Sequence, residues 1–304
     1  MRSQRLRVAF ARLGLPLWFL MIDTQVIGPG TLPGGDAILY AHGAASYIHG
    51  LDPWSASLVA NGQTYHFAGL PPTVLAFIPF SGLPDWVTGW GWVVLSALSA
   101  GLIVWRLKLT WFYLLFPPLL SGVASGNPQI ALLALLLVGA GPLASLLKIY
   151  AIVPMVGERR WRSVTVSGAL LLATVAVAPG LWATYASRLS QISSTLITES
   201  HGGFSAWGQP WPILAATVVA LLVIARFNGG TAGWLAVPAI WPASEYHYAT
   251  MILPISAPLL AFAIAIPWYG VPALVTIGYA AVLVMKTFGK DRWPLRRTAL
   301  AGAV

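Results

Sequence analysis

Long apolar runs separated by short polar breaks fill most of this sequence. The runs begin near residue 13 and recur as far as residue 285. A helix that crosses a bilayer needs about 20 consecutive, mainly apolar residues. The pattern therefore predicts an all-α fold, a polytopic transmembrane helical bundle of about 8–11 spans. In this interpretation residues 1–304 form a single integral membrane domain, without a separate soluble domain.

The first apolar run, residues 13–28, follows a basic start, as the core of a signal peptide does. No small-residue cleavage site follows it, and Asp23 and Gln25 lie in its continuation. We therefore expect a retained first helix whose N-terminus lies in the cytoplasm.

The longest polar segment, residues 29–69, contains Asp36, Asp52 and His66 but no Lys or Arg. Cytoplasmic loops carry an excess of Lys and Arg, so this segment is expected to be the first extracytoplasmic loop. Within it, residues 36–50 have helical character, which predicts a short helix at the membrane surface.

The next apolar stretch, residues 71–80, is too short to span a bilayer. If the following run, 87–105, ends in the cytoplasm at Arg106 and Lys108, the short stretch is re-entrant or interfacial. The alternative is two short spans that place Arg106 outside.

Six further apolar runs are predicted to continue the bundle. They cover residues 111–124, 130–156, 164–185, 213–226, 233–240 and 251–266, and a final run covers 271–285. A second extracytoplasmic loop is predicted at 187–210, with Arg188, Glu199 and His201. If successive spans cross the membrane in alternating directions, the basic C-terminal tail lies outside the cytoplasm. This contradicts the rule that positively charged segments stay inside, so whether the number of spans is odd or even stays open.

Composition agrees with a membrane protein and excludes several other classes. The chain is 58% hydrophobic and 8% charged, whereas soluble domains have about 25% charged residues. The net charge of +9 comes from small basic clusters between apolar runs, which indicates cytoplasmic loops rather than nucleic-acid binding. The absence of cysteine excludes disulfides and thiolate catalysis. A multi-pass protein of a cell membrane, such as the bacterial plasma membrane, is expected.

Polar residues in such a chain need an explanation, because an ionisable group at membrane depth costs a few kcal/mol. On the predicted topology they collect at the outer side, as in a pocket built between helices. The candidates are Asp36, Asp52, His66, Asn127, Gln129, Lys148, His201, Glu245 and His247.

Each candidate also has a purely structural explanation. Asp36 follows two glycines and is suited to cap the surface helix. Asp52 precedes Pro53 and is typical of a turn. Lys148 can extend its ammonium group toward an interface. Glu245 and His247 can belong to an exposed loop. The sequence shows no metal-ligand spacing, phosphate-binding glycine loop or Ser-His-Asp pattern. No cofactor is therefore expected, although a divalent metal stays compatible with the sequence.

An ordered set of short motifs resembles glycosyltransferase family 87, whose members are polytopic GT-C-type enzymes that use polyprenyl-phosphate sugars. The motifs are Asp36-x-x-x-Tyr40, Gly50-x-Asp52-Pro53-Trp54, Leu70-Pro71-Pro72, Gly126-Asn127-Pro128-Gln129, Lys148 and His247-Tyr248. The third resembles the family's Tyr-Pro-Pro step, the fourth its Gly-Gln-x-Asn turn with the amides exchanged, and Lys148 the lysine of its Lys-Pro step. The resemblance covers about residues 13–266. The chain is shorter than is usual for the family, and the interval from Asn127 to Lys148 is compressed.

The resemblance implies a membrane glycosyltransferase of the mannosyltransferase-like kind. It would transfer a hexose such as mannose, or a pentose, from a polyprenyl-phosphate donor to a glycan or glycolipid acceptor outside the cytoplasm. Asp36 is then the general base, and Lys148 and His247 contact the donor phosphate. Substrate-binding roles fall to Tyr40, Asp52, His66, Asn127, Gln129 and Glu245.

Two other functions stay open at this stage. A transporter or lipid flippase predicts paired broken helices in two related halves and polar groups at the bilayer midplane. No similarity between halves is visible here, which disfavours transport. An inactive GT-C-like assembly subunit is the third hypothesis, and the short chain is compatible with it.

Overall fold

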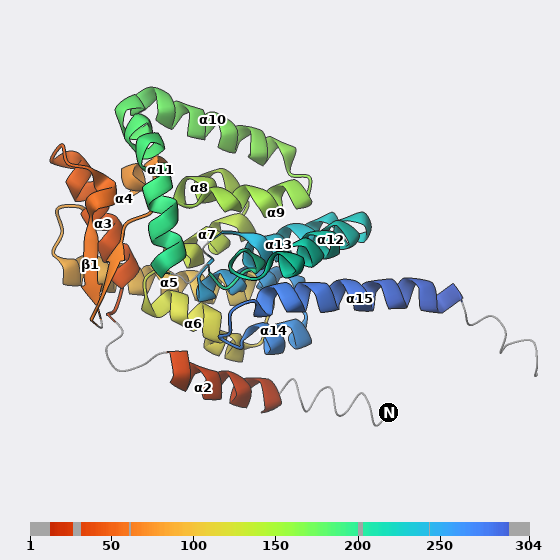
Figure 1. Cartoon of the computed structure of the whole chain (residues 1–304). Helices are drawn as coiled ribbons and strands as arrows, with labels where there is room; N and C mark the ends of the chain where they lie inside the picture. The colour runs from red at the N-terminus through yellow and green to blue at the C-terminus, as the bar shows by residue number, and fades with distance from the viewer. Residues whose placement is uncertain (1–12, 27–31, 61, 200–202, 243, 292–304) are drawn as a thin grey trace, which may run out of the picture.

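The computed structural model describes residues 13–26, 32–60, 62–199, 203–242 and 244–291, and they are mostly helical (Figure 1). The α-helices are α2 (Leu15–Val26), α3 (Gly35–Ile48), α4 (Pro71–Phe77), α5 (Asp85–Arg106), α6 (Pro117–Ala124), α7 (Pro128–Leu137), α8 (Gly141–Leu147), α9 (Ile152–Gly157), α10 (Trp161–Val177), α11 (Pro179–Glu199), α12 (Trp211–Phe227), α13 (Gly229–Ile240), α14 (Pro258–Ile264) and α15 (Val271–Asp291). The 3₁₀ helices are η2 (Pro53–Ser55), η3 (Ile78–Phe80), η4 (Trp111–Leu115), η5 (Ile149–Ala151), η6 (Ala206–Gly208) and η7 (Tyr246–Ile255).

Two predicted elements match the structure closely. The helix expected within residues 36–50 is α3, which starts directly after Gly34, a glycine with φ of 70°. Its location at a membrane surface stays a prediction. The run predicted at 87–105 is α5, which has Asp85 in its first turn and Arg106 in its last. These charges oppose the helix dipole at each end and favour these limits.

The first predicted loop contains a feature that the all-α prediction missed. Strands β1 (Ser57–Ala60) and β2 (Gln63–His66) form an antiparallel hairpin in which Ser57 lies opposite His66. Gly62, with φ of 73°, supplies the positive φ that a tight hairpin turn needs. The prediction of a purely helical fold is therefore wrong for this segment.

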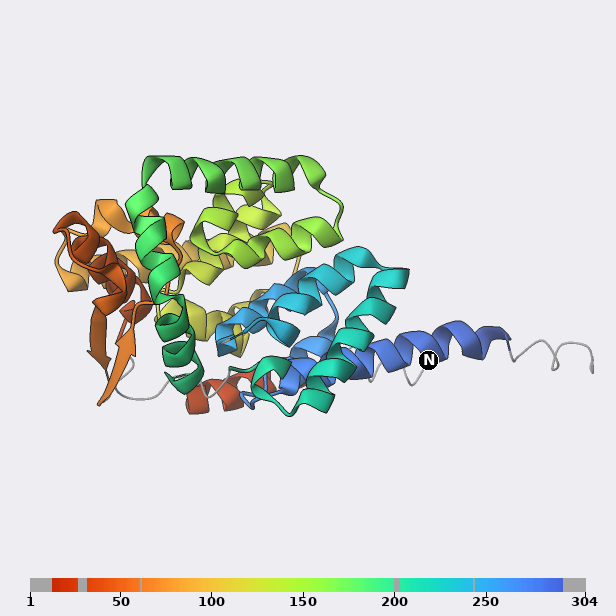
Figure 2. The same cartoon turned by 45° about the horizontal axis from the view of Figure 1, so that its top comes forward.

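Several runs that were predicted as continuous spans are broken. The run predicted at 164–185 is divided into α10 and α11, which meet at 100°. The break that was predicted between residues 124 and 130 is the bend between α6 and α7, which meet at 120° (Figure 2). The run predicted at 251–266 is divided into η7 and α14, with Ser256 between them at φ of 53°. Pro128, Pro179 and Pro258 each start the helix after a break, because proline fits the first turn of a helix but not its interior.

The second predicted loop also differs from expectation. Residues 187–199 form the second half of α11. Between residue 203 and the start of α12, the structure contains only the short helix η6. His201 lies outside the described residues.

Among the described residues, α5 is the one helix that is both long and apolar enough to cross a bilayer alone. The number rises to three if the pairs α6–α7 and α10–α11 each count as one bent span. The predicted 8–11 spans are not confirmed by these lengths and stay a prediction.

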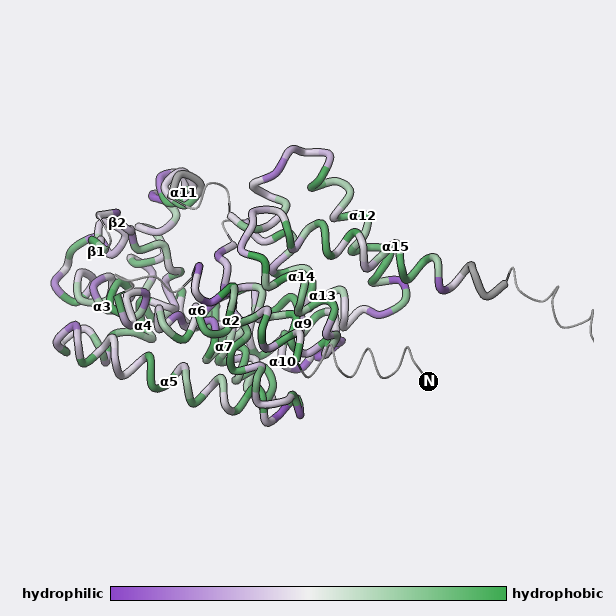
Figure 3. Tube along the Cα trace, turned by 90° about the horizontal axis from the view of Figure 1, so that it is seen from below, coloured by the Kyte–Doolittle hydropathy of each residue, from purple (hydrophilic) through white to green (hydrophobic). Residues whose placement is uncertain are grey.

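One face of α5 presents large apolar side chains outward, opposite the buried face that contains Trp92 and Ile103. The outward-facing side chains recur at about every fourth position and so follow one face of the helix. The outward-facing set is Trp86, Trp90, Val94, Leu98 and Trp105. Figure 3 shows that hydrophobic residues dominate the helices, while hydrophilic residues gather at turns and helix ends.

Basic residues collect where the C-terminal ends of several helices meet. Nε of Arg106 donates to the carbonyl of Leu137, and a guanidinium nitrogen of Arg160 donates to the carbonyl of Leu136. Both carbonyls belong to the last turn of α7. The α12–α13 turn is packed against Gly157, where an added Cβ would lie 2.5 Å from the carbonyl oxygen of Gly229. We call this region the basic end; it comprises Arg106, Lys108, Arg159, Arg160 and Arg226.

The turn between α6 and α7 lies far from the basic end. The backbone of Gly34 donates to Ala124, and Gly126 packs beside Trp92 of α5. Trp92 precedes Arg106 by four helical turns, which is about 20 Å along the helix axis. Helix α3 and the α6–α7 turn therefore lie toward the opposite end of the molecule.

Candidate functional site

Asp36 is held in place by the close packing of α3 on the α6–α7 turn. Its backbone N–H donates to the carbonyl of Ser125 at 2.9 Å. The contact needs glycine at position 34, where an added Cβ would lie 2.2 Å from the backbone oxygen of Gly89. The first turn of α3 therefore presents its carboxylate to the α6–α7 turn.

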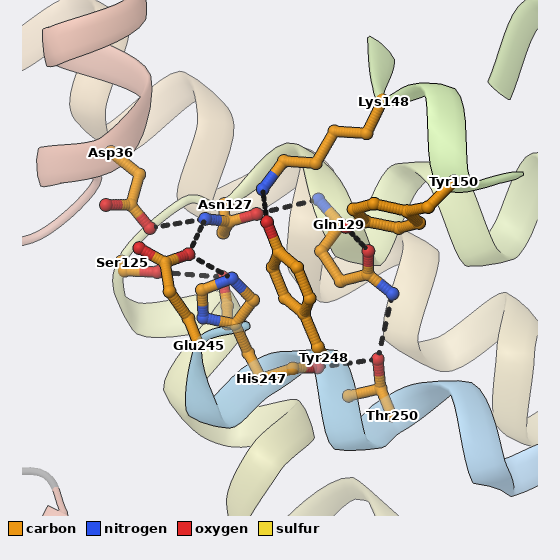
Figure 4. Close-up of polar contacts among 11 residues, drawn as sticks. Asp36, Ser125, Asn127, Gln129, Lys148, Tyr150, Glu245, His247, Tyr248 and Thr250 are labelled. Atoms are coloured by element: carbon orange, nitrogen blue, oxygen red, sulfur yellow. Dashed lines mark hydrogen bonds and ion pairs between the residues drawn. The ribbon is translucent and has the colours of Figure 1, made fainter. Parts of the chain in front are cut away.

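Asn127 connects that carboxylate to a second one. Its side-chain oxygen accepts from the backbone N–H of Gln129 at 2.9 Å and so caps the start of α7. Its Nδ2 donates to Oδ2 of Asp36 at 2.7 Å and lies 3.5 Å from Oε2 of Glu245 (Figure 4). One amide group therefore bridges two carboxylates from distant parts of the chain.

Glu245 also forms an ion pair with His247 at the start of η7. The distance from Nε2 of the imidazole to Oε2 of the carboxylate is 2.9 Å. The His247 side chain is 7% exposed and that of Glu245 is 47% exposed. This pair therefore leads from a buried imidazole to the molecular surface.

Lys148 lies at the break between α8 and η5, where the backbone is extended. Its ammonium group donates to the Tyr248 hydroxyl at 3.1 Å. It also lies 4.7 Å from the ring centroid of Tyr248 and 6.0 Å from those of Tyr40 and Tyr150. The faces of aromatic rings attract cations, so this surrounding of rings accommodates a charge that is 9% exposed.

A buried hydrogen-bond chain runs from Tyr150, whose ring lies beside Lys148, to the backbone of His247. The Tyr150 hydroxyl donates to Oε1 of Gln129, and Nε2 of Gln129 donates to the Thr250 hydroxyl at 3.3 Å. Thr250 in turn donates to the backbone carbonyl of His247 at 2.8 Å. Networks of this kind fix their members in one arrangement.

These contacts define one assembly from α3, the α6–α7 turn, the α8–η5 break and η7, which we call the polar cluster. It comprises Asp36, Tyr40, Asn127, Gln129, Lys148, Tyr150, Glu245, His247, Tyr248 and Thr250. Seven of the residues predicted from sequence are thus brought together: Asp36, Tyr40, Asn127, Gln129, Lys148, Glu245 and His247.

The two carboxyl groups of the cluster differ in acidity. Burial raises the pKa of Asp36, and the negative charge of Glu245 raises it further. The charge of His247 and the hydrogen bond from Asn127 oppose this and are smaller effects. For Glu245, burial alone would raise the pKa, but the charge and hydrogen bond of His247, together with the charge of Lys148, lower it to about 2. Asp36 is therefore the more basic carboxylate.

Asp52 and His66 were predicted as substrate-binding residues but make other contacts. Asp52 accepts from the backbone of Trp54 and pairs with Arg188 of α11 at 2.9 Å. His66 lies on β2 and lines a small cavity of about 70 Å³ together with Trp54 and Arg188. The turn explanation of Asp52 therefore describes its structural role.

Tyr150, Tyr248 and Thr250 belong to the cluster, although they were not selected as site residues. In the sequence, Tyr150 stands two residues after Lys148, and Tyr248 follows His247 directly. A tyrosine in an apolar chain is common at membrane interfaces, so its type alone does not mark a site.

A metal centre finds no support in the part of the chain that the structure describes. No group of three or more His, Asp or Glu side chains there is arranged to hold an ion. Acids and imidazole in this cluster instead pair with each other and with amides.

Comparisons with known proteins gave no match. No protein-family model, no curated protein and no solved structure is similar to the chain.

Proposed function

We propose that this protein is a membrane glycosyltransferase that transfers a sugar from a polyprenyl-phosphate donor to an acceptor hydroxyl on the extracytoplasmic face. The observation that carries the proposal is the convergence of Asp36, Asn127, Lys148, Glu245 and His247 in one cluster. Carboxylates, a lysine and a histidine are the groups that such a transfer requires, and they come from four separate chain segments.

Membrane embedding is supported by the outward-facing apolar side chains of α5 and by the low content of charged residues. Water-soluble proteins rarely expose large apolar patches. The sidedness follows from charge, because basic ends face the cytoplasm. The polar cluster, which lies toward the other end of α5, then faces the extracytoplasmic side.

The transfer itself needs a base and an anion site. The acceptor oxygen forms a bond to the anomeric carbon, and the bond from that carbon to the donor phosphate oxygen breaks. The bonding electron pair goes to the phosphate, while the acceptor proton goes to Asp36. A carboxylate whose pKa is raised is the better proton acceptor of the two in the cluster.

The departing polyprenyl phosphate gains negative charge, which Lys148 and His247 stabilise. His247 is itself buried, but it is paired with the half-exposed Glu245 and so lies on the solvent-facing side of the polar cluster. Lys148 supplies its positive charge from the inner side of the cluster, where Tyr248 holds it. Asn127 positions both carboxylates.

The proposal is tested by incubating the purified protein in lipid bilayers with polyprenyl-phosphate hexoses and pentoses and measuring the release of polyprenyl phosphate. Nucleotide sugars with the same sugar groups are the control donors. Turnover of a lipid-phosphate donor alone is the expected result. Turnover of none of the lipid donors in the presence of acceptor glycolipids contradicts catalysis and favours the inactive subunit. Movement of the intact donor between leaflets favours the flippase.

A further inference from the structure

A hollow of about 370 Å³ lies at the basic end, beside the last residues of α5. It is lined by Val104, Trp105, Arg106, Lys108 and Leu109. The polar cluster does not contribute to it, because the α6–α7 turn packs beside Trp92, four helical turns away. The hollow is therefore separate from the candidate active site.

A hydrogen bond to the backbone positions Arg106, and the local backbone conformation positions Lys108. Arg106 uses Nε to cap a carbonyl in the last turn of α7, which leaves its two terminal nitrogens for another partner. Lys108 follows the helix with φ of 53°. This left-handed conformation costs a non-glycine residue energy, and the turn it produces brings the lysine back beside the end of α5.

Among the residues that the structure describes, no acidic side chain lines the hollow. Glu158, the acid at the neighbouring α9–α10 turn, is occupied by Arg160 and by the indole N–H of Trp234. The described lining of the hollow therefore carries the positive charges of Arg106 and Lys108 without a carboxylate beside them.

Exposed indoles surround the same region. Trp105 is 71% exposed, Trp111 is 73% exposed and Trp161 is 58% exposed. Trp rings concentrate at the headgroup level of membranes, where one edge is apolar and the other is wet. Basic residues beside such rings, next to an apolar helix surface, match the chemistry of a lipid headgroup.

We propose that this hollow binds the headgroup of an anionic phospholipid in the cytoplasmic leaflet. Arg106 and Lys108 contact the phosphate, and Trp105 lies against the headgroup–acyl boundary. The inference goes beyond sugar transfer and depends only on membrane embedding, so it stands or fails separately from the catalytic proposal.

Native mass spectrometry of the purified protein titrated with phosphatidylglycerol or phosphatidylcholine tests the proposal. Arg106→Gln and Lys108→Asn remove one charge each, and asparagine tolerates the left-handed conformation at position 108. Each change is expected to weaken phosphatidylglycerol binding about fivefold, and both together about thirtyfold. Arg106→Lys keeps the charge and is expected to bind nearly as well as the native protein.

Arg188→Gln is the matched control, since it removes an exposed guanidinium far from the basic end, on α11. Equal binding of the two lipids by the native protein overturns the proposal. So does an unchanged affinity of the double variant, or an equal loss in Arg188→Gln. Displacement of the lipid by inorganic phosphate identifies a simple anion site and overturns the lipid assignment. Elution volume and apparent melting temperature establish that each variant is folded.

Discussion

The side-chain amide of Asn127 donates to the carboxylate of Asp36 at 2.7 Å, and the same nitrogen lies 3.5 Å from Glu245. An N–H donor stabilises a carboxylate in its charged form. The amide therefore opposes the effect of burial, which raises the pKa of Asp36. Two acids that would repel each other are held at fixed positions by one neutral group.

Replacing Asn127 separates its capping role from its bridging role. Asn127→Ser keeps an oxygen that caps α7 but loses the amide, whereas Asn127→Ala loses both functions. Donor turnover is expected to fall about tenfold or more in both variants, because a hydrogen bond to a charged group is lost. The apparent melting temperature is expected to fall mainly in the alanine variant, which loses about 1 kcal/mol of cap stabilisation. Full turnover by Asn127→Ser would show that the bridge is not needed.

Replacing Glu245 is expected to shift the pH dependence of turnover. Asp36 acts as a base only when deprotonated, so turnover declines as the pH falls through its raised pKa. Glu245→Gln removes a negative charge that raises this pKa more than His247 lowers it. The pKa of Asp36 is therefore expected to fall. The acidic limb of the pH–rate profile is expected to move to lower pH, and a shift to higher pH would contradict the assignment.

Lys148→Met tests the need for a buried positive charge. Methionine fits an apolar, aromatic surrounding, so the variant is expected to fold with unchanged or higher stability. Turnover is expected to fall about a hundredfold or more, as when one electrostatic donor is removed from an anion site. Lys286→Met, at an exposed position of α15, is the control and is expected to keep native turnover. Equal turnover in the two variants would exclude Lys148 from the site.

The ion pair between Asp52 and Arg188 is expected to be dispensable. Its distance is 2.9 Å, but the arginine side chain is 48% exposed. Exposed ion pairs contribute less than about 1 kcal/mol to stability. Arg188→Gln should leave turnover within about twofold of native and the melting temperature nearly unchanged. A large loss of turnover would extend the active site to this pair.

The sequence identified the polar residues of the cluster because each stands out in an apolar chain. Asp36, Lys148 and His247 are costly in a membrane protein unless they have partners, and their order along the chain suggested a common site. Asp52 resembles them in type, but a local turn explains it. Residue type alone does not separate these two cases.

The aromatic surrounding of Lys148 and the bend between α10 and α11 were not predictable in the same way. Tyrosines are frequent in membrane proteins, so Tyr150 carried no distinct signal, and Tyr248 was noted only as the neighbour of His247 in a motif. The break between α6 and α7 was predicted from the polar residues at 125–129, whereas the bend between α10 and α11 falls inside the run predicted at 164–185. Such a bend depends on whether neighbouring elements satisfy the freed backbone groups, which is a property of the packed structure.

The proposed sugar transfer is tested most directly by comparing Asp36→Asn with Asp85→Asn. Asparagine at position 36 keeps the shape and an oxygen that accepts from Asn127, but it cannot take a proton. Asp85 is an exposed carboxylate paired with His42 at 2.9 Å, away from the cluster, and serves as the matched control. Because burial and Glu245 disfavour the charge of Asp36, the first variant is expected to be at least as stable as the native protein.

The measurement is the rate of polyprenyl-phosphate release from a polyprenyl-phosphate sugar in bilayers. Asp36→Asn is expected to lose a factor of about 10² to 10⁴, the usual contribution of a general base, while Asp85→Asn keeps the native rate. A native rate in Asp36→Asn would contradict the account.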